Sequence, residues 1–252
     1  MILNNKGMRY SIIIPTYNEE GTVVLLYHSI REVMSKLNES YEIIFVDDGS
    51  TDSSLQKLKG IQVTSHGLVI IVLRKRVGKS EALQAGFDYA VGEIYVTLDA
   101  DGQNDPCDIP SLLNKMEEGY DVVYGYRYRM HSSFRKKLAS KIANIVNRLI
   151  TKINIHDIGC ALRVFRKKDI EHVCLSRGLH RFFSTIMIRL GYRVGEIKVN
   201  HYPRISGVSQ YGILNRLKEV LIDCFRLIFI DIDILMKHKR QYQIQEIIRN
   251  LP

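Results

Sequence analysis

The chain has 252 residues, of which 46% are hydrophobic and 25% charged, and this composition excludes an extensively disordered or fibrous protein. The length suits one large α/β domain, alone or with a short appendage. Lysine and arginine together number 36 against 27 aspartate and glutamate, so the formal net charge is +9. This charge indicates an anionic partner: a nucleic acid, a phosphorylated ligand or an anionic membrane.

The first hundred residues alternate short β-rich runs with helical patterns. Apolar runs predict strands, and apolar residues at a spacing near 3.6 predict the helices between them. The predicted strands are 10–14, 41–46, 67–73 and 93–98; the segment 15–18 is a predicted turn, and the predicted helices are 19–37, 53 onward and 80–90. Because each strand is apolar almost throughout, we expect an α/β fold with a Rossmann-like, mostly parallel sheet covered by helices on both faces.

The second half of the chain has a different character. No acidic residue occurs between Asp121 and Asp157, and this interval is rich in lysine and arginine. Apolar residues from 134 to 149 fall at helical spacing, which predicts a basic amphipathic helix that either lies on a membrane or packs on the core. A second apolar helix is predicted over 214–236, either buried or in a bilayer interface. The polar tail 237–252 is predicted to be frayed or a short helix.

The cysteines and the lengths of the apolar runs indicate the cellular compartment. The four cysteines contain no CxxC pair, so neither a zinc ribbon nor a disulfide framework is indicated and a reducing cytoplasmic compartment fits best. The N-terminal apolar run ends at Pro15, so we expect no signal peptide. No uninterrupted apolar run reaches the ~18 residues that a membrane span requires, so we expect no transmembrane helix.

Polar clusters follow the predicted strands at Ile14, Val46, Leu73 and Leu98. Ligands of parallel α/β sheets bind beyond the carboxyl ends of the strands, so we expect these clusters to share one ligand-binding edge. In extended chain, residues i and i+2 face the same way. The carboxylates of Asp99 and Asp101 can therefore converge on a hard cation such as Mg²⁺, which takes oxygen ligands. The alternative is a solvated loop that caps a helix.

Two further loops on this edge have more than one interpretation. Asp47 and Asp48 could accept hydrogen bonds from a nucleotide base or ribose, or form an Asx-turn. The segment Gly78–Ser80 is not a Walker A loop, because Leu73 stands where that motif requires its first glycine. What remains is a basic loop, including Lys79, near a helix N-terminus that suits an anion. No GxGxxG occurs, which argues against a nicotinamide enzyme.

His180 and Arg181 lie in a polar segment with phosphate-binding chemistry. Arginine recognises phosphate through a planar fork of donors. The structural alternatives are a histidine satisfied within the core and an arginine paired with a core carboxylate.

Together, these motifs resemble the family 2 glycosyltransferases of the GT-A fold. Within that family they are similar to the polyprenyl-phosphate sugar synthases, the branch of dolichyl-phosphate mannose synthase. The resemblance covers roughly residues 9–225 and rests on SIIIPTYNE (11–19), VDDGSTD (46–52), GKSEAL (78–83), TLDADGQNDP (97–106), DIGC (157–160), LHRF (179–182) and GVSQYG (207–212). The sequence departs from the family at Gly102, where many relatives carry leucine. It departs again at Gln210, where lysine is usual.

The resemblance implies roles for four groups of residues. The nucleotide base and ribose would be held by Pro15, Tyr17, Glu19 and Asp48, with Lys79 nearby. Asp99 would face the ribose and diphosphate, and the metal would be bound by Asp101 and Gln103 beside it. The acceptor phosphate or the diphosphate would lie near Arg127, His180 and Arg181, and a loop closing over the donor would include Arg204, Ser206, Ser209 and Tyr211.

The implied enzyme is metal-dependent, with Mg²⁺ or Mn²⁺, and inverting. It would move a hexose from a UDP- or GDP-sugar to a polyprenyl or dolichyl phosphate at the cytoplasmic face of a membrane. Residues 1–212 would form the GT-A catalytic domain and 213–252 a helical appendage, which could lie in the membrane interface. The basic segment near 134–152 would meet anionic headgroups, which favours a membrane surface over nucleic acid.

Two alternatives stay open. One is a family 2 enzyme with a saccharide or another soluble acceptor, in which Asp157 is the candidate general base. The other is a basic binding module without catalytic activity, in which Asp99 and Asp101 would be dispensable.

Overall fold

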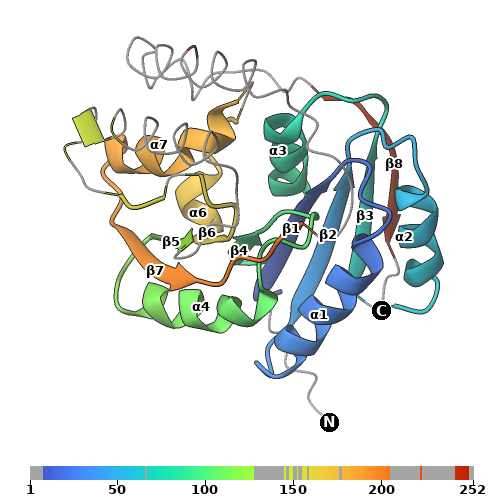
Figure 1. Ribbon diagram of the computed structural model, residues 1–252, viewed down its shortest axis with the longest axis horizontal. Coiled ribbons are helices and arrows are strands. Elements are labelled where there is room, and N and C mark those ends of the chain that lie inside the picture. The colour runs from blue at the N-terminus through green and yellow to red at the C-terminus, as the bar shows by residue number, and fades with distance from the viewer. Residues whose placement is uncertain are drawn as a thin grey trace.

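The computed structural model describes residues 8–65, 67–127, 145, 148–149, 152, 155–157, 159–175, 178–204, 222 and 242–249. Within them the strands form one eight-stranded sheet, in the order β7-β5-β6-β4-β1-β2-β3-β8 (Figure 1). The strands are β1 (Tyr10–Thr16), β2 (Tyr41–Asp47), β3 (Leu68–Leu73), β4 (Ile94–Thr97), β5 (Val122–Arg127), β6 (Arg163–Arg166), β7 (Val194–Val199) and β8 (Ile244–Arg249).

Most of the sheet is parallel. Strand β1 pairs in parallel with β2 and β4, β2 with β3, and β5 with β7. Only β6 and β8 run antiparallel to their neighbours within the described residues. The carboxyl ends of the other six strands therefore meet at one edge, and the expected α/β class with a mostly parallel sheet is confirmed.

Helices cover both faces of the sheet (Figure 1). They are α1 (Val23–Ser35), α2 (Ser54–Gln62), α3 (Lys79–Tyr89), α4 (Ile109–Glu117), α6 (Lys167–Ile170) and α7 (Phe183–Arg189), with the 3-10 turns η1 (Pro106–Asp108) and η2 (Leu179–Phe182). Alternate strand residues point to opposite faces. Ile13 thus packs in the cluster that includes α3 and α7, whereas Ile12 and Ile14 pack with α1 and α4.

The loop between β1 and α1 is longer than the sequence predicts. Strand β1 continues to Thr16, whose carbonyl accepts the backbone N–H of Asp48 at 2.8 Å. Helix α1 begins at Val23 rather than at Glu19, because the Thr22 hydroxyl is bonded to the carbonyls of Glu19 at 3.0 Å and Ala100 at 2.6 Å. Residues 17–22 are therefore held as a loop against the segment that follows β4.

The predicted frayed or helical tail is wrong for Ile244–Arg249, which form strand β8. This strand pairs antiparallel with β3, with Ile248 opposite Ile70 and Ile247 opposite Ile71. Its isoleucines reach the clusters on both faces of the sheet, which is why it pairs rather than remaining in solvent. The helical appendage proposed for 213–252 therefore does not include this strand. Residues 213–221 and 223–241 lie outside the described residues.

Most of the predicted basic helix near 134–152 also lies outside the described residues. Its described members Ile145, Arg148 and Leu149 are helical and exposed, with 51% of Ile145 and 75% of Leu149 accessible to solvent. Among the residues that the structure describes, no helix has the length and apolar character needed to cross a bilayer.

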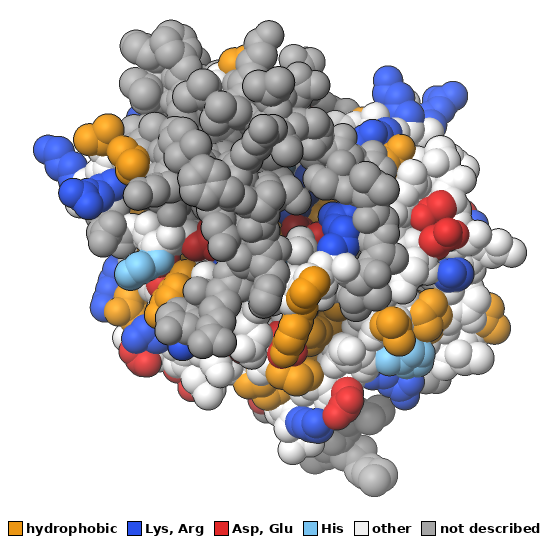
Figure 2. Space-filling model, viewed as in Figure 1, with side chains coloured by type: hydrophobic (Ala, Val, Ile, Leu, Met, Phe, Trp, Pro, Cys, Tyr) orange, Lys and Arg blue, Asp and Glu red, His pale blue; other side chains and the backbone are white. Residues whose placement is uncertain are grey.

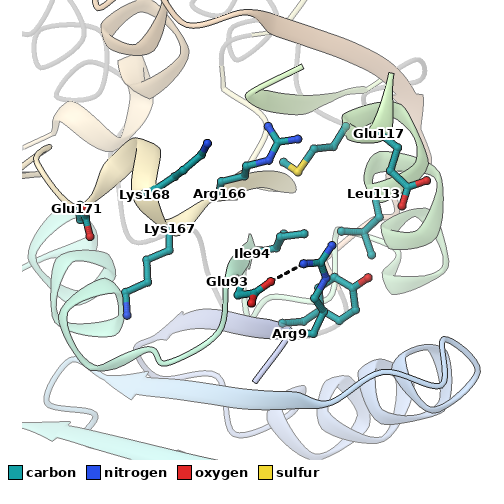
Figure 3. A pocket seen from close by; sticks show the side chains of 11 residues that line it. Arg9, Glu93, Ile94, Leu113, Glu117, Arg166, Lys167, Lys168 and Glu171 are labelled. Carbon is teal, nitrogen blue, oxygen red and sulfur yellow. Dashed lines mark hydrogen bonds and ion pairs between the residues drawn. The ribbon is translucent and has the colours of Figure 1, made fainter. Parts of the chain in front are cut away.

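A cavity of about 450 Å³ opens at the amino-terminal ends of β1 and β4, opposite the edge where the polar loops gather. Figure 3 shows Arg9 paired with Glu93 on one side of it and Arg166 on another, over a floor that includes Ile94 and Leu113. None of the predicted site residues lines it.

Candidate active site at the strand ends

Asp99 follows the end of β4 and meets the first residue of α3. Its Oδ1 forms an ion pair with the ammonium of Lys79. Burial alone would raise the pKa of Asp99, but the charge and hydrogen bond of Lys79 outweigh burial and lower that pKa. Asp99 is therefore held ionised, as a carboxylate ligand of a metal must be.

Asp101 is buried beside it and has a cationic partner of its own. Its Oδ2 accepts from Nη2 of Arg204 at 2.9 Å, and its Oδ1 accepts the backbone N–H of Gln103 at 3.1 Å. Burial and the nearby Asp99 carboxylate raise the pKa of Asp101 against the opposing effect of Arg204. The intervening Gly102 has a φ of 72°, a left-handed conformation that glycine adopts more readily than residues with a side chain.

These oxygens suit a hard divalent cation. The two carboxylates lie close enough to interact, and each already holds a cationic side chain. Among the described residues no cluster offers three or more carboxylate, imidazole or thiolate donors, so a cation here would complete its shell with phosphate oxygens and water. The side-chain amide of Gln103 donates to the carbonyl of Tyr202 at 3.3 Å.

Glu19 joins this cluster through the same arginine. Arg204 places Nη1 3.3 Å from Oε1 of Glu19, so one guanidinium bridges Glu19 and Asp101. The other oxygen of Glu19, Oε2, is buried without a hydrogen-bond partner. Burial raises the pKa of Glu19 to about 7, with Arg204 opposing the shift. A buried, unpartnered carboxylate oxygen is a site for a donor from a ligand.

Tyr17 offers a flat apolar surface on the same edge. It is half-buried, as is Pro15 within β1, and the guanidinium of Arg76 lies 4.0 Å from the centre of the Tyr17 ring. This is a cation–π contact between the loops that follow β1 and β3.

Asp47 and Asp48 have different positions. Asp47 accepts the backbone N–H of Ser50, three residues on, at 3.2 Å, and so stabilises the local turn. Asp48 accepts the N–H groups of Val77 at 2.7 Å and Gly78 at 2.9 Å, one on each oxygen. The structure therefore shows Asp48 holding the loop from which Lys79 projects.

Arg127 and Asp157 form a tight pair at the end of β5. Nε of Arg127 lies 2.5 Å from Oδ2 of Asp157, and Nη2 lies 2.8 Å from Oδ1. Oδ1 also accepts the N–H of Gly159 at 3.1 Å. Burial alone would lower the pKa of Arg127, but the bond to Asp157 outweighs it and raises that pKa. Both oxygens of Asp157 are thus engaged, so the structure does not present it as a free general base.

His180 lies in η2 against the start of α3. The Ser80 hydroxyl accepts the N–H groups of Gly178 at 3.0 Å and His180 at 3.4 Å, and it lies 2.7 Å from Nδ1 of His180. Ser80 therefore holds His180 at two atoms, the backbone nitrogen and Nδ1. Arg181 is half-buried beside it. Ser206, Ser209 and Tyr211 lie outside the described residues.

Sequence patterns missed three residues of this region: Arg76, Ser80 and Arg163. Arg76 and Ser80 were visible only as members of a basic loop and of a failed Walker pattern. Arg163 had one signal, a charge inside the apolar run from Leu162 to Phe165. Figure 2 shows basic and acidic side chains next to one another in the middle of the viewed face, which agrees with a site built from paired charges.

Comparison with known proteins places the chain in a family. The model of glycosyl transferase family 2 matches residues 11–174. The chain belongs to glycosyl transferase family 2. It is 36% identical over 230 residues to a dodecaprenyl-phosphate galacturonate synthase of Rhizobium johnstonii, covering 89% of this chain and 68% of that protein. It is 34% identical over 215 residues to an undecaprenyl-phosphate 4-deoxy-4-formamido-L-arabinose transferase of Aeromonas hydrophila, covering 84% of this chain and 66% of the relative. The chain thus spans about two thirds of these relatives.

Solved structures confirm the GT-A fold. Glucosyl-3-phosphoglycerate synthase from Mycobacterium tuberculosis, crystallised with Mn²⁺, UDP and phosphoglyceric acid, has a TM-score of 0.69 at 18% identity over 89% of this chain and 80% of that one. Mannosyl-3-phosphoglycerate synthase from Rubrobacter xylanophilus has a TM-score of 0.66 at 14% identity over 86% and 72%. At these identities the likeness concerns the fold alone. Membership of glycosyl transferase family 2 identifies this protein as an enzyme, a glycosyltransferase.

Proposed function

We propose that this enzyme transfers a hexose from a nucleotide diphosphate sugar to a polyprenyl phosphate, with inversion at the anomeric carbon. The observation that carries the proposal is the pair Asp99 and Asp101, which lies at the strand ends with Lys79 and Arg204 bound to it. The polyprenyl-phosphate sugar enzymes among its relatives support the acceptor class. A phosphate oxygen of the acceptor forms the new bond to the anomeric carbon. The bond to the diphosphate breaks, and the nucleoside diphosphate leaves with the electron pair.

The donor diphosphate would lie at this pair. A divalent cation, Mg²⁺ or Mn²⁺, would be held by Asp99, Asp101 and Gln103 and would neutralise charge on the leaving diphosphate. Lys79 and Arg204 are the cations that the diphosphate would meet in place of the carboxylates they now hold. Their fixed positive charge stabilises the same leaving group.

The nucleoside would lie between the loops after β1 and β3. The free Oε2 of Glu19 would accept a ribose hydroxyl. The base would stack near Tyr17, whose ring is backed by Arg76, with Pro15 beside it. The position of Asp48 supports an indirect part for it, through the loop that carries Lys79.

The acceptor phosphate would lie on the side of Arg127, His180 and Arg181. Asp157 holds Arg127 by two bonds, and Ser80 holds His180 in place at the start of α3. A phosphate acceptor is already an anion and needs no general base. The engaged state of Asp157 therefore favours a phosphate acceptor over a hydroxyl acceptor, which would need such a base.

We propose a peripheral position on the cytoplasmic face of the membrane. The support is the acid-free basic segment between Asp121 and Asp157 and, within it, the exposed Ile145 and Leu149 around Arg148. Apolar side chains interleaved with basic ones suit a surface of anionic lipid, to which each basic residue contributes about 1 kcal/mol.

A direct transfer assay tests the function. UDP- and GDP-hexoses labelled in the sugar are incubated with undecaprenyl phosphate and Mg²⁺ or Mn²⁺, and the label is followed into the organic phase. Transfer that Asp101→Ala abolishes is the expected result. Label that reaches only water-soluble acceptors would support the soluble-acceptor alternative and overturn the proposal.

A further inference from the structure

Arg163 is a buried cation behind the candidate site. It is the first residue of β6, where it lies opposite Thr97 of β4 and Tyr124 of β5. Only 5% of its surface is exposed. A buried guanidinium normally pairs with a carboxylate, because desolvation of the charge is otherwise costly. None of the carboxylates in the described part of the chain forms an ion pair with Arg163.

Backbone carbonyls and aromatic faces hold this guanidinium instead. Nε donates to the carbonyl of Cys160 at 2.8 Å, and Nη1 donates to the carbonyl of His180 at 2.8 Å. The guanidinium carbon lies 5.3 Å from the ring centre of Tyr124 and 5.9 Å from that of Phe183. Such contacts fix the direction in which both carbonyls point.

The two carbonyls belong to different loops of the acceptor side. Cys160 ends the turn that begins with Asp157, the partner of Arg127. His180 lies in η2, and its other side is bound by Ser80. One side chain therefore connects the loop behind Arg127 to the segment that carries His180 and Arg181.

We propose that Arg163 is a positioning residue for the acceptor phosphate: by bonding the carbonyls of Cys160 and His180 it sets the spacing between Arg127 and His180. This inference rests on the proposed function and adds to it a residue that touches neither substrate. Among the described residues the side chain of Arg163 forms no hydrogen bond or ion pair with the donor loops, and it acts on them only through the effect of its charge on Asp99. Its loss should therefore weaken binding of the acceptor much more than binding of the nucleotide. A misplacement of about 1 Å in such a site costs on the order of 100-fold in rate.

The test compares Arg163→Met with Arg166→Met. Arg166 ends the same strand and also donates to a carbonyl, that of Tyr120 at 3.1 Å, but it lines the cavity at the far edge of the sheet. For Arg163→Met we expect kcat/KM for undecaprenyl phosphate to fall about 30-fold or more, chiefly through KM. We expect Arg166→Met to remain within about threefold of the parent enzyme.

Nucleotide binding and hydrogen exchange complete the test. With Mn²⁺, calorimetric Kd values for UDP and GDP should change much less in Arg163→Met than the acceptor KM does, while amide exchange in 157–160 and 178–182 should quicken. An unchanged KM for the acceptor, or equal losses for acceptor and nucleotide, would overturn the inference. If Arg163→Met does not fold, Arg163→Lys decides, with an expected rise of about tenfold in acceptor KM. If the parent enzyme does not use undecaprenyl phosphate, the proposed function is overturned. The structural part of the inference is still tested, because hydrogen exchange shows whether Arg163 holds the two loops.

Discussion

The proposed donor side and the proposed acceptor side of this site are held together in different ways. On the donor side, Arg204 bridges Glu19 and Asp101, and Lys79 pairs with Asp99. These pairs join groups that are all candidate contacts of the donor nucleotide or its metal, so a bound donor would replace each contact with one of its own.

On the acceptor side, the contacts run from side chains to a supporting frame. Asp157 holds Arg127 by two bonds, and Ser80 holds His180 at two atoms. A bound phosphate need not break any of these contacts. The donor side is thus built to exchange partners, whereas the acceptor side is built in advance, which reduces the free energy spent on ordering when the acceptor binds.

The largest expected effect is on catalysis and comes from a substitution on the donor side. Asp101→Ala should lower kcat for sugar transfer by about 1,000-fold, because both a metal ligand and the partner of Arg204 are lost. Transfer of labelled hexose to undecaprenyl phosphate measures this. Asp121→Asn, at the start of β5 and far from the strand-end loops, is the matched control and should retain activity. Undiminished transfer by Asp101→Ala would remove Asp101 from the reaction.

The second largest expected effect is on the free energy of unfolding, which should respond differently to substitutions on the two sides. Asp157→Asn leaves the buried guanidinium of Arg127 without its ion pair and should lower the free energy of unfolding by about 3 kcal/mol. Asp101→Asn removes a buried charge that Asp99 repels, so it should be neutral or stabilising at pH 7. Urea unfolding without divalent metal measures both variants. Equal destabilisation by the two substitutions would contradict the contrast between the sides.

The pH dependence of stability tests Glu19 by a route independent of activity. Its pKa is raised from 4.5 to about 7 in the folded state, so the folded protein keeps a proton that the unfolded chain loses in that range. The free energy of unfolding therefore has its full contribution from protonated Glu19 below pH 4.5. This contribution is lost as the pH rises through 7, by about 3 kcal/mol in all.

Glu19→Gln should remove this loss. Its advantage in unfolding free energy over the parent enzyme should grow between pH 5 and pH 8, as measured by urea titration without divalent metal. Glu20→Gln, the exposed neighbour, is the control. A difference that stays constant with pH would mean that Glu19 is ionised in both states.

The smallest expected effect concerns the nucleoside surface. Arg76→Ala removes the cation behind the Tyr17 ring, a contact of about 0.5–1 kcal/mol. KM for the donor should rise about threefold to fivefold with kcat unchanged. Lys75→Ala, a neighbouring exposed residue of the same loop, controls for loss of loop charge. If the two variants weaken the donor equally, general charge rather than the ring contact explains the effect.

Local patterns predicted the sheet and the proximity of Asp99 and Asp101 because both depend on short spacings. Apolar runs marked β1 to β4, and the i, i+2 relation at a strand end marked Asp99 and Asp101. The contacts that finish the site span long stretches of chain: Arg204 reaches Asp101 across 103 residues, and Ser80 reaches His180 across 100. Periodicity in the sequence cannot predict contacts between residues so far apart. Strand β8 was not predicted for the same reason, because its partner β3 lies far away in sequence.

The pairing of β8 with β3 has a consequence for how this protein is made and handled. Strand β3 carries six consecutive buried residues, Leu68–Leu73, and its outer backbone groups are bonded only when residues 244–249 are present. During synthesis that edge stays unpaired until residues 244–249 have left the ribosome. A version shortened before residue 244 would present an open, apolar edge strand, which is a template for intermolecular β pairing. We expect such a version to aggregate even though every candidate catalytic residue is retained.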